Sequence, residues 1–128
     1  MRRKDVKTMI AYYFGIPAMR ALLEDERTEL EAEYNRNRLE EISVRDHVLI
    51  RDQEIIQDCL DVLKGEYKRL LFFKHRDKYS WAKIAAKNGV PERTAHWRYD
   101  KAVDRLGEAL EEVPMVEELW ARALRARD

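Results

Sequence analysis

The stretch YSWAKIAAKNGVPERTAHWRYDKAVDRL, Tyr79 to Leu106, has the pattern of two helices joined by a short turn. Ser80 is suited to cap a first helix over residues 81–88, because its hydroxyl can accept a hydrogen bond from a free N–H of the first turn. Gly89 fits the left-handed position that ends such a helix. Pro91 or Glu92 then fits the first turn of a second helix, which we expect to continue to about residue 110.

The residues between and inside these helices predict how the two pack. A helix-turn-helix needs a small residue where the helices approach, a residue tolerant of positive φ in the turn, and buried apolar anchors. Ala85 fits the close approach, Gly89 the turn, and Val90 the space between the helices. Ala95 and Tyr99 begin the inner face of the second helix. The stretch therefore predicts a helix-turn-helix.

The composition favours helices along the rest of the chain. Of 128 residues, 45% are hydrophobic and 39% charged, with only four glycines and three prolines. A many-stranded β fold needs more turn residues, whereas Ala, Leu, Glu, Lys and Arg are good helix formers. We predict an all-α fold in three segments: a helical hairpin over residues 1–64, the helix-turn-helix domain over 65–113, and a C-terminal amphipathic helix within 114–128.

Within the hairpin, residues 5–14 predict a short helix that Gly15-Ile16-Pro17 interrupts. A long helix then runs from Pro17 to about Arg38, and Tyr34 belongs to its apolar stripe.

The bend of the hairpin is expected at residues 35–38 or at Ser43. Ser43 could cap a second long helix over residues 44–63. Gly65 would end or bend that helix, and residues 66–76 predict the helix that precedes the helix-turn-helix.

Charge is distributed unevenly, although the formal net charge is zero. Residues 1–64 hold eleven basic and fourteen acidic side chains, a net charge of −3. Residues 65–110 hold eleven basic and six acidic, a net charge of +5, and residues 111–128 hold three and five, a net charge of −2. This asymmetry is typical of a local phosphate-binding surface on a neutral protein.

Several other classes of function lack a sequence signal. No long apolar run or leader pattern is present, and the lone Cys59 fits a reducing compartment, so we expect a cytoplasmic protein without membrane contact. His47, His75 and His96 are scattered, which predicts no metal site. No phosphate-cradling glycine loop or nucleophile elbow occurs, so we expect neither a cofactor nor an enzyme.

Residues 63–110 resemble the fourth region of bacterial sigma-seventy-type sigma factors. That pattern has a leucine-rich helix, an aromatic loop, S-[WY]-x-x-I-A, a glycine-hydrophobic turn and a long helix ending A-x-x-x-L. The matching residues are Leu70, Leu71, Phe73, Tyr79, Ser80, Trp81, Ile84, Ala85, Gly89, Val90, Thr94, Ala102 and Leu106. The first 62 residues are too few for the preceding sigma domain. With YFGIPAMRALLEDERTELEAEYN, they look more like phage-encoded ArpU-like and RinA-like late transcription regulators.

The resemblance implies a phage or prophage regulator that binds specific double-stranded DNA, with a homodimer and RNA polymerase as further expected partners. The helix from Pro91 would enter the major groove by its N-terminal part. There Arg93 could hydrogen-bond guanine, Glu92 could accept from cytosine, His96 could reach a base edge or phosphate, and Trp97 could contact thymine methyls or the backbone. The alternative is that Glu92 and Arg93 are solvated and Trp97 packs on another helix.

A second set of residues would position the protein on phosphates without reading sequence. These expected phosphate contacts are Lys78, Lys83, Lys87, Thr94, Arg98, Lys101 and Arg105. Any one of them could instead be an ordinary solvated charge. Tyr79 and Trp81 have the spacing of packing residues more than of base-stacking ones.

Two other functions fit the same module. It could belong to a small-terminase-like subunit in DNA packaging, or to an interaction module that binds polymerase without touching DNA. The C-terminal amphipathic helix could cover its own domain, seal a dimer or dock a partner.

Overall fold

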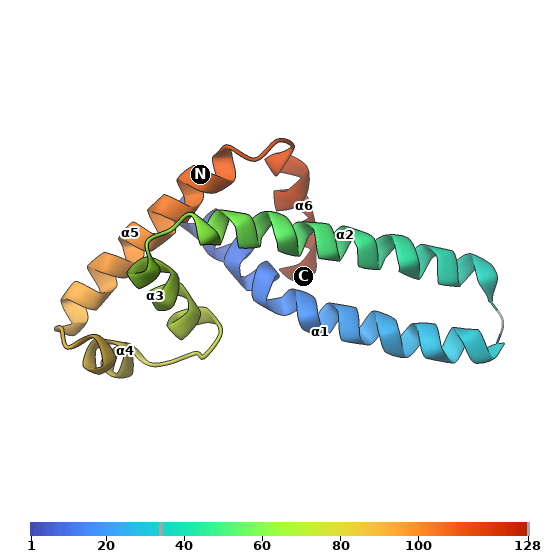
Figure 1. Cartoon of the computed structure of the whole chain (residues 1–128), viewed down its shortest axis with the longest axis horizontal. Helices are drawn as coiled ribbons and strands as arrows, with labels where there is room; N and C mark the ends of the chain where they lie inside the picture. Colours follow the sequence, from blue (N-terminus) through green and yellow to red (C-terminus); the bar gives the residue numbers. More distant parts are fainter. Residues whose placement is uncertain (34, 128) are drawn as a thin grey trace.

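The computed structural model describes residues 1–33 and 35–127, and within that part the chain is all-α, as predicted (Figure 1). Tyr34 and Asp128, which the sequence places in the apolar stripe and at the end of the C-terminal segment, lie outside the described residues. The helices are α1 (Arg3–Glu33), α2 (Arg36–Asp61), α3 (Gly65–His75), α4 (Trp81–Asn88), α5 (Glu92–Glu111) and α6 (Val116–Arg127).

α1 is one continuous helix, so the predicted interruption at Gly15-Ile16-Pro17 is wrong. Pro17 removes one backbone hydrogen bond, which costs about 3 kcal/mol in a helix interior. It lies on the exposed side, however, while Ile10, Tyr13 and Ile16 of the neighbouring turns are buried. Burial of such side chains is worth about 1.5–3 kcal/mol each, and this packing outweighs the lost bond.

The bend of the hairpin falls at Asn35, within one of the two predicted positions. Asn35 is the N-cap of α2, and its side chain accepts a hydrogen bond from the backbone N–H of Arg38 at 3.2 Å. Ser43 lies inside α2, so its predicted role as a cap is wrong. The two residues are equally good capping types, and only the packing of the two helices selects between them.

The distal parts of α1 and α2 extend away from the rest of the molecule as a two-helix arm, residues 20–33 and 36–47 (Figure 1). Its interior is thin and centres on the buried Ile42. Arg20 and Asp46 form an ion pair across it at 2.8 Å. Two large apolar side chains remain exposed on the arm, Leu22 at 69% and Val44 at 64%.

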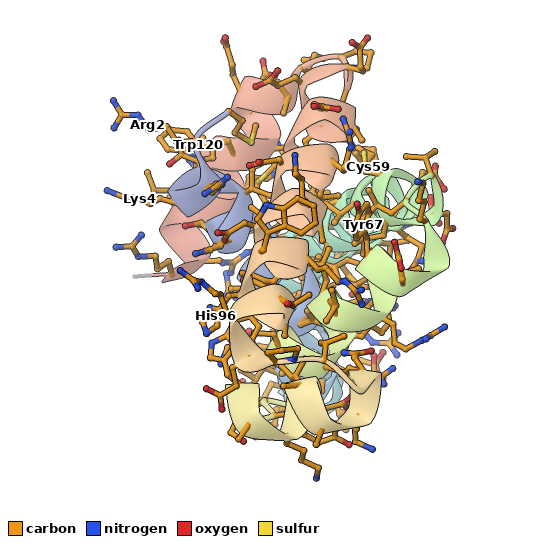
Figure 2. All side chains as sticks on the ribbon, turned by 90° about the vertical axis from the view of Figure 1, so that its left-hand side faces the viewer. Arg2, Lys4, Cys59, Tyr67, His96 and Trp120 are labelled. Atoms are coloured by element: carbon orange, nitrogen blue, oxygen red, sulfur yellow. The ribbon has the colours of Figure 1, made fainter. Side chains whose placement is uncertain are left out.

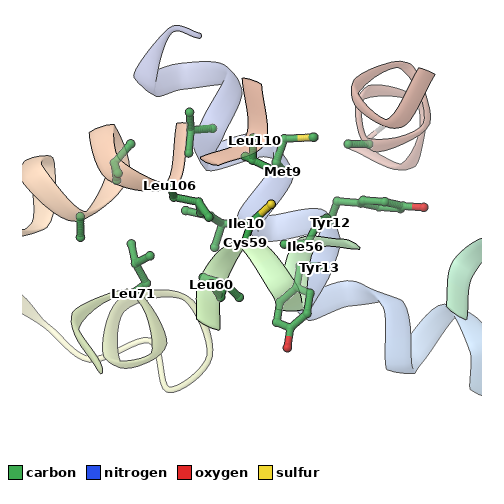
Figure 3. Packing of buried hydrophobic residues seen from close by; sticks show 14 of the residues in the cluster. Met9, Ile10, Tyr12, Tyr13, Ile56, Cys59, Leu60, Leu71, Leu106 and Leu110 are labelled. Atoms are coloured by element: carbon green, nitrogen blue, oxygen red, sulfur yellow. The ribbon is translucent and has the colours of Figure 1, made fainter. Parts of the chain in front are cut away.

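One hydrophobic core joins α1, α2, α3, α5 and α6 (Figure 3). α1 contributes Met9 and Ile10, and α2 contributes Ile56 and Leu60. The other buried members are Val6, Tyr12, Tyr13, Ile16, Cys59, Leu71, Tyr99, Ala102, Val103, Leu106, Leu110, Leu119 and Ala123. Side chains from all three predicted segments thus share this core, and the amphipathic stripe of α6 packs within its own chain.

A buried ion pair fixes α6 to the hairpin. Asp52 of α2 is fully buried, and its carboxylate accepts from the Nε and Nη2 of Arg122 at 2.7 Å each. It also accepts from the Tyr12 hydroxyl at 2.6 Å. Burial, and then this hydrogen bond to Asp52, raise the pKa of Tyr12 above its ordinary value. α1, α2 and α6 therefore meet at one satisfied polar centre.

Candidate nucleic-acid interface

The turn between α4 and α5 has the local structure that its residues predict. The Ser80 hydroxyl caps α4 by accepting from the N–H of Lys83 at 3.2 Å. Gly89 ends α4 in the left-handed region, with φ 63° and ψ 34°. The N–H of Val90 then donates to the carbonyl of Ala85 at 3.1 Å, which closes the helix end as in a Schellman motif.

The two helices approach each other through alanines. Ala85 of α4 and Ala95 of α5 are 5% and 0% exposed, and both belong to a small second core with Ile84 and Leu70. Small side chains at both positions let the two backbones come close. α3 supports this pair from the other side, since Leu70 comes from α3.

α5 presents four different faces. Its inner face is buried and begins with Ala95 and Tyr99. Arg93 and Trp97 are one turn apart and exposed, and Trp97 is 60% exposed, so the alternative that Trp97 packs on another helix is not what the structure shows. We call this pair the outer stripe. Within the described residues Arg93 forms no ion pair, which leaves its guanidinium free.

His96 lies on the other side of the outer stripe together with Glu92. Its ring stacks on Trp81 of α4, with ring centroids 3.7 Å apart and planes at 28°. Trp81 also makes an edge contact with Tyr99 at 5.1 Å, so it packs between helices as its spacing predicts. The four residues predicted to read bases thus divide into an outward pair, Arg93 and Trp97, and a side pair of which His96 is held by an aromatic stack.

Four of the predicted phosphate contacts share one side of α5. Thr94, Arg98, Lys101 and Arg105 are spaced by four, three and four residues, which places them along one stripe of a helix. We call this stripe the basic flank. Lys101 lies over the Trp97 ring at 5.3 Å, and Arg105 is paired with Glu108 at 3.1 Å.

The other three expected phosphate contacts lie on and before α4. The ammonium groups of Lys83 and Lys87 lie over the Tyr79 ring, 4.0 and 5.5 Å from its centroid. Lys78 adopts a positive φ of 54° in the loop before α4. These three lysines form no ion pair with any residue that the structure describes.

The first turns of α1 bring further charge to α5, which the sequence analysis did not anticipate. Arg3 contacts Asp104 at 2.8 Å and Asp100 at 3.5 Å, and its hydrogen bond to Asp104 lowers the pKa of that carboxyl. Two acidic side chains of α5 are thereby compensated from α1. Close approach is possible because Gly107 of α5 has no side chain; a Cβ there would lie 3.0 Å from Val6.

A hollow of about 360 Å³ opens beside these contacts, between α1, α3, α4 and α5. Lys7 and Lys74 line it with Trp81 and His96. His75 also lines it and meets the Tyr99 hydroxyl at 2.6 Å through Nε2. Burial, followed by the charges of Lys7 and Lys74, lowers the pKa of His75 to about 4. Lys7 and Lys74 are 67 positions apart in the sequence, so no local pattern could have predicted that they line the same hollow.

Comparison with known proteins adds no relative: no family model matches the chain, and neither a curated protein nor a solved structure does. In the described ranges, 1–33 and 35–127, no helix is long and apolar enough to cross a membrane. The same ranges hold no group of three or more His, Cys, Asp or Glu side chains placed to bind a metal ion.

Proposed function

We propose that the protein binds specific double-stranded DNA and regulates transcription, with α5 in the major groove. The observation that carries the proposal is the outer stripe. Arg93 and Trp97 project from the first turns of a helix whose opposite face is anchored by Ala95 and Tyr99. Among the residues that the structure describes, Arg93 forms no ion pair and Trp97 is 60% exposed, and arginine and large apolar side chains can contact base edges.

The surrounding charge supports the same placement. The major groove is about 12 Å wide and admits one α-helix, so phosphates border an inserted helix along its sides. The basic flank of α5 lies along one of these sides, and Lys83 and Lys87 extend the positive surface onto α4. Arg93 would hydrogen-bond a base, while Trp97 would contact a thymine methyl or the sugar-phosphate backbone.

The arm suggests how the protein would assemble. Leu22 and Val44 are exposed on a two-helix arm that projects away from α5, and such apolar side chains suit contact with a second copy or with RNA polymerase. A homodimer would present two copies of α5 to two half-sites. Phage or prophage origin is implied by the resemblance of the N-terminal stretch YFGIPAMRALLEDERTELEAEYN to phage-encoded late transcription regulators, and it remains part of the proposal.

Two matched substitutions test the proposal. The bound sequence is first selected from random DNA, and affinities are then measured by fluorescence anisotropy at fixed salt. Arg93→Ala should weaken binding to the selected site by about 1–3 kcal/mol and relax the preference at one base pair. Lys101→Ala should weaken all sequences alike and flatten the salt dependence.

Two outcomes would contradict this function. If neither substitution alters DNA binding, α5 does not occupy the groove. If the mass in solution is that of a closed ring of many subunits, the protein is a DNA-packaging subunit and not a transcription regulator. A monomer or dimer that binds one site tightly supports regulation.

A further inference from the structure

The basic flank lies on one side of α5 only, so α5 itself offers no basic side chain to DNA phosphates on its opposite side. Its members, Thr94 to Arg105, all lie on a single stripe, whereas the other side of α5 carries His96 and the acidic Asp100. A helix that fills the major groove has phosphates along both sides. Either this second side faces no phosphate, or positive charge reaches it from elsewhere in the fold.

The hollow beside His96 supplies that charge from two other helices. Lys7 of α1 holds its ammonium 5.5 Å from the centre of the Tyr99 ring. Lys74 of α3 holds its ammonium 4.8 Å from the centre of the Trp81 ring. Such cation–π contacts keep a flexible lysine near one position without neutralising it. Within the described residues, neither lysine forms an ion pair.

Among the described residues that line the hollow, one is acidic, and it already forms an ion pair. Asp100 lies 3.5 Å from Arg3, which also holds Asp104. The imidazole of His75 stays neutral near pH 7, because its pKa is lowered to about 4, and the two nearest lysine charges contribute to that shift. Two positive charges therefore act on one small volume, and the negative charge at its edge is compensated.

The position of the hollow matches the missing side of the interface. His96 lines it and belongs to the second turn of α5, beside Arg93. In Figure 2, His96 lies on the same side of α5 as Arg2 and Lys4 at the start of α1. Tyr67 of α3 lies on the opposite side of α5 in the same view.

We infer that the hollow between Lys7 and Lys74 is an anion subsite that takes one phosphate group, namely a backbone phosphodiester of the DNA strand bordering the second side of α5. This inference rests on the proposed function and adds α1 and α3 to the surface that holds DNA. With the basic flank opposite, α5 is clamped from both sides. The subsite positions the protein and reads no base.

The test uses the full chain, the selected duplex and a series of salt concentrations. Each phosphate contact contributes a slope of about −0.9 to the plot of log affinity against log salt, so its loss costs about eightfold at 0.1 M salt. Lys7→Gln and Lys74→Gln should each weaken binding by about this factor and reduce the slope by about one contact. The base preference of the selected site should not change.

Two further variants sharpen the result. Asp100→Asn removes the negative charge at the edge of the subsite and should raise the affinity. Arg45→Gln removes one exposed positive charge from the arm and should leave affinity and slope unchanged. Thermal melting of the three glutamine variants should match the parent chain, because Lys7 and Arg45 are exposed and glutamine keeps most of the lysine stem. Asp100→Asn gives up an exposed ion pair with Arg3, which is worth about 0–1 kcal/mol.

The failures of the two proposals are distinguishable. If the parent chain binds DNA and Arg93→Ala weakens it, but Lys7→Gln and Lys74→Gln behave like Arg45→Gln, the subsite is wrong and the groove model stands. If the parent chain binds no duplex, both the proposed function and the phosphate subsite are wrong. Calorimetric titration with inorganic phosphate is a further arm: saturable binding lost in Lys7→Gln, without any effect on DNA, would assign the hollow to a free phosphate and overturn the DNA contact.

Discussion

Replacing Arg122 with alanine tests whether a buried ion pair fixes α6 to the hairpin. The carboxylate of Asp52 is fully buried and receives two hydrogen bonds from Arg122 at 2.7 Å and one from Tyr12 at 2.6 Å. Without Arg122 this charge keeps one hydrogen bond of three. Breaking a buried pair from one side costs about 3–5 kcal/mol, because the remaining charge is left uncompensated.

The lower end of that range applies here. The side chain of Arg122 is 24% exposed, so water can enter the space that it vacates and solvate Asp52 in part. We therefore expect a loss of about 3 kcal/mol in the free energy of unfolding. This is a large share of the 5–15 kcal/mol that stabilises a typical protein.

Urea unfolding followed by circular dichroism at pH 7 measures the loss, and Arg105→Ala is the matched control. Arg105 is also a helical arginine paired with a carboxylate, but its side chain and that of Glu108 are 56% and 63% exposed. An exposed pair of this kind is worth about 0–1 kcal/mol. The same substitution in the two places isolates the effect of burial.

A second substitution makes the result decisive. Asp52→Asn in the Arg122→Ala background removes the uncompensated charge, so the double variant should recover part of the lost stability. If Arg122→Ala costs no more than Arg105→Ala, or if Asp52→Asn adds to the damage, the carboxylate is not held as a buried charge by Arg122 and the reasoning is refuted.

Two further predictions concern the helix pair. Ala85→Leu should destabilise the protein by about 1–3 kcal/mol in urea unfolding, because it overpacks the crossing with Ala95, and the folded fraction should keep its base preference. The pKa of His75 falls from 6.5 in the unfolded chain to about 4 in the folded one, so only the unfolded chain takes up a proton between these values. Stability should therefore be constant above about pH 7.5 and fall by about 1–2 kcal/mol between there and pH 5, allowing for the partial exposure of the ring. His75→Gln should lack this slope, and parallel curves for the two proteins would contradict the assignment.

The parts of the fold that the sequence predicted best are those decided within a few residues. Ser80 and Gly89 act on N–H and carbonyl groups three to five positions away, so their types alone indicate where α4 begins and ends. Local residue types mispredict a helix end where core packing determines it. Pro17 predicts a helix boundary, yet α1 continues because Ile16 and its neighbours are buried in the core.

Only the part of the candidate site that lies on one stretch of sequence, namely α5, could be predicted. The stripes of α5 follow from helical spacing, which is why Arg93, Trp97 and the basic flank could be assigned from the sequence. Lys7 and Lys74 could not be assigned to the site, since residues 1–64 carry a net charge of −3 and Lys7 lies 67 positions before Lys74 in the sequence. Only the packing of α1 against α5 at Gly107 brings its first turns to the site.

The continuity of α1 has a consequence for any dimer formed through the arm. Its 31 residues span about 46 Å at 1.5 Å per residue, from Arg3 beside α5 to Glu33 at the tip of the arm. Arg3 and Lys7, one turn apart, both face α5, so the helix is fastened at the proposed DNA surface. Had Pro17 broken α1, the arm could pivot and two half-sites could be bound at several spacings. A helix that is continuous through Pro17 instead transmits the orientation of the arm to α5, and the proposed dimer should accept one half-site spacing and lose affinity when base pairs are inserted between the half-sites.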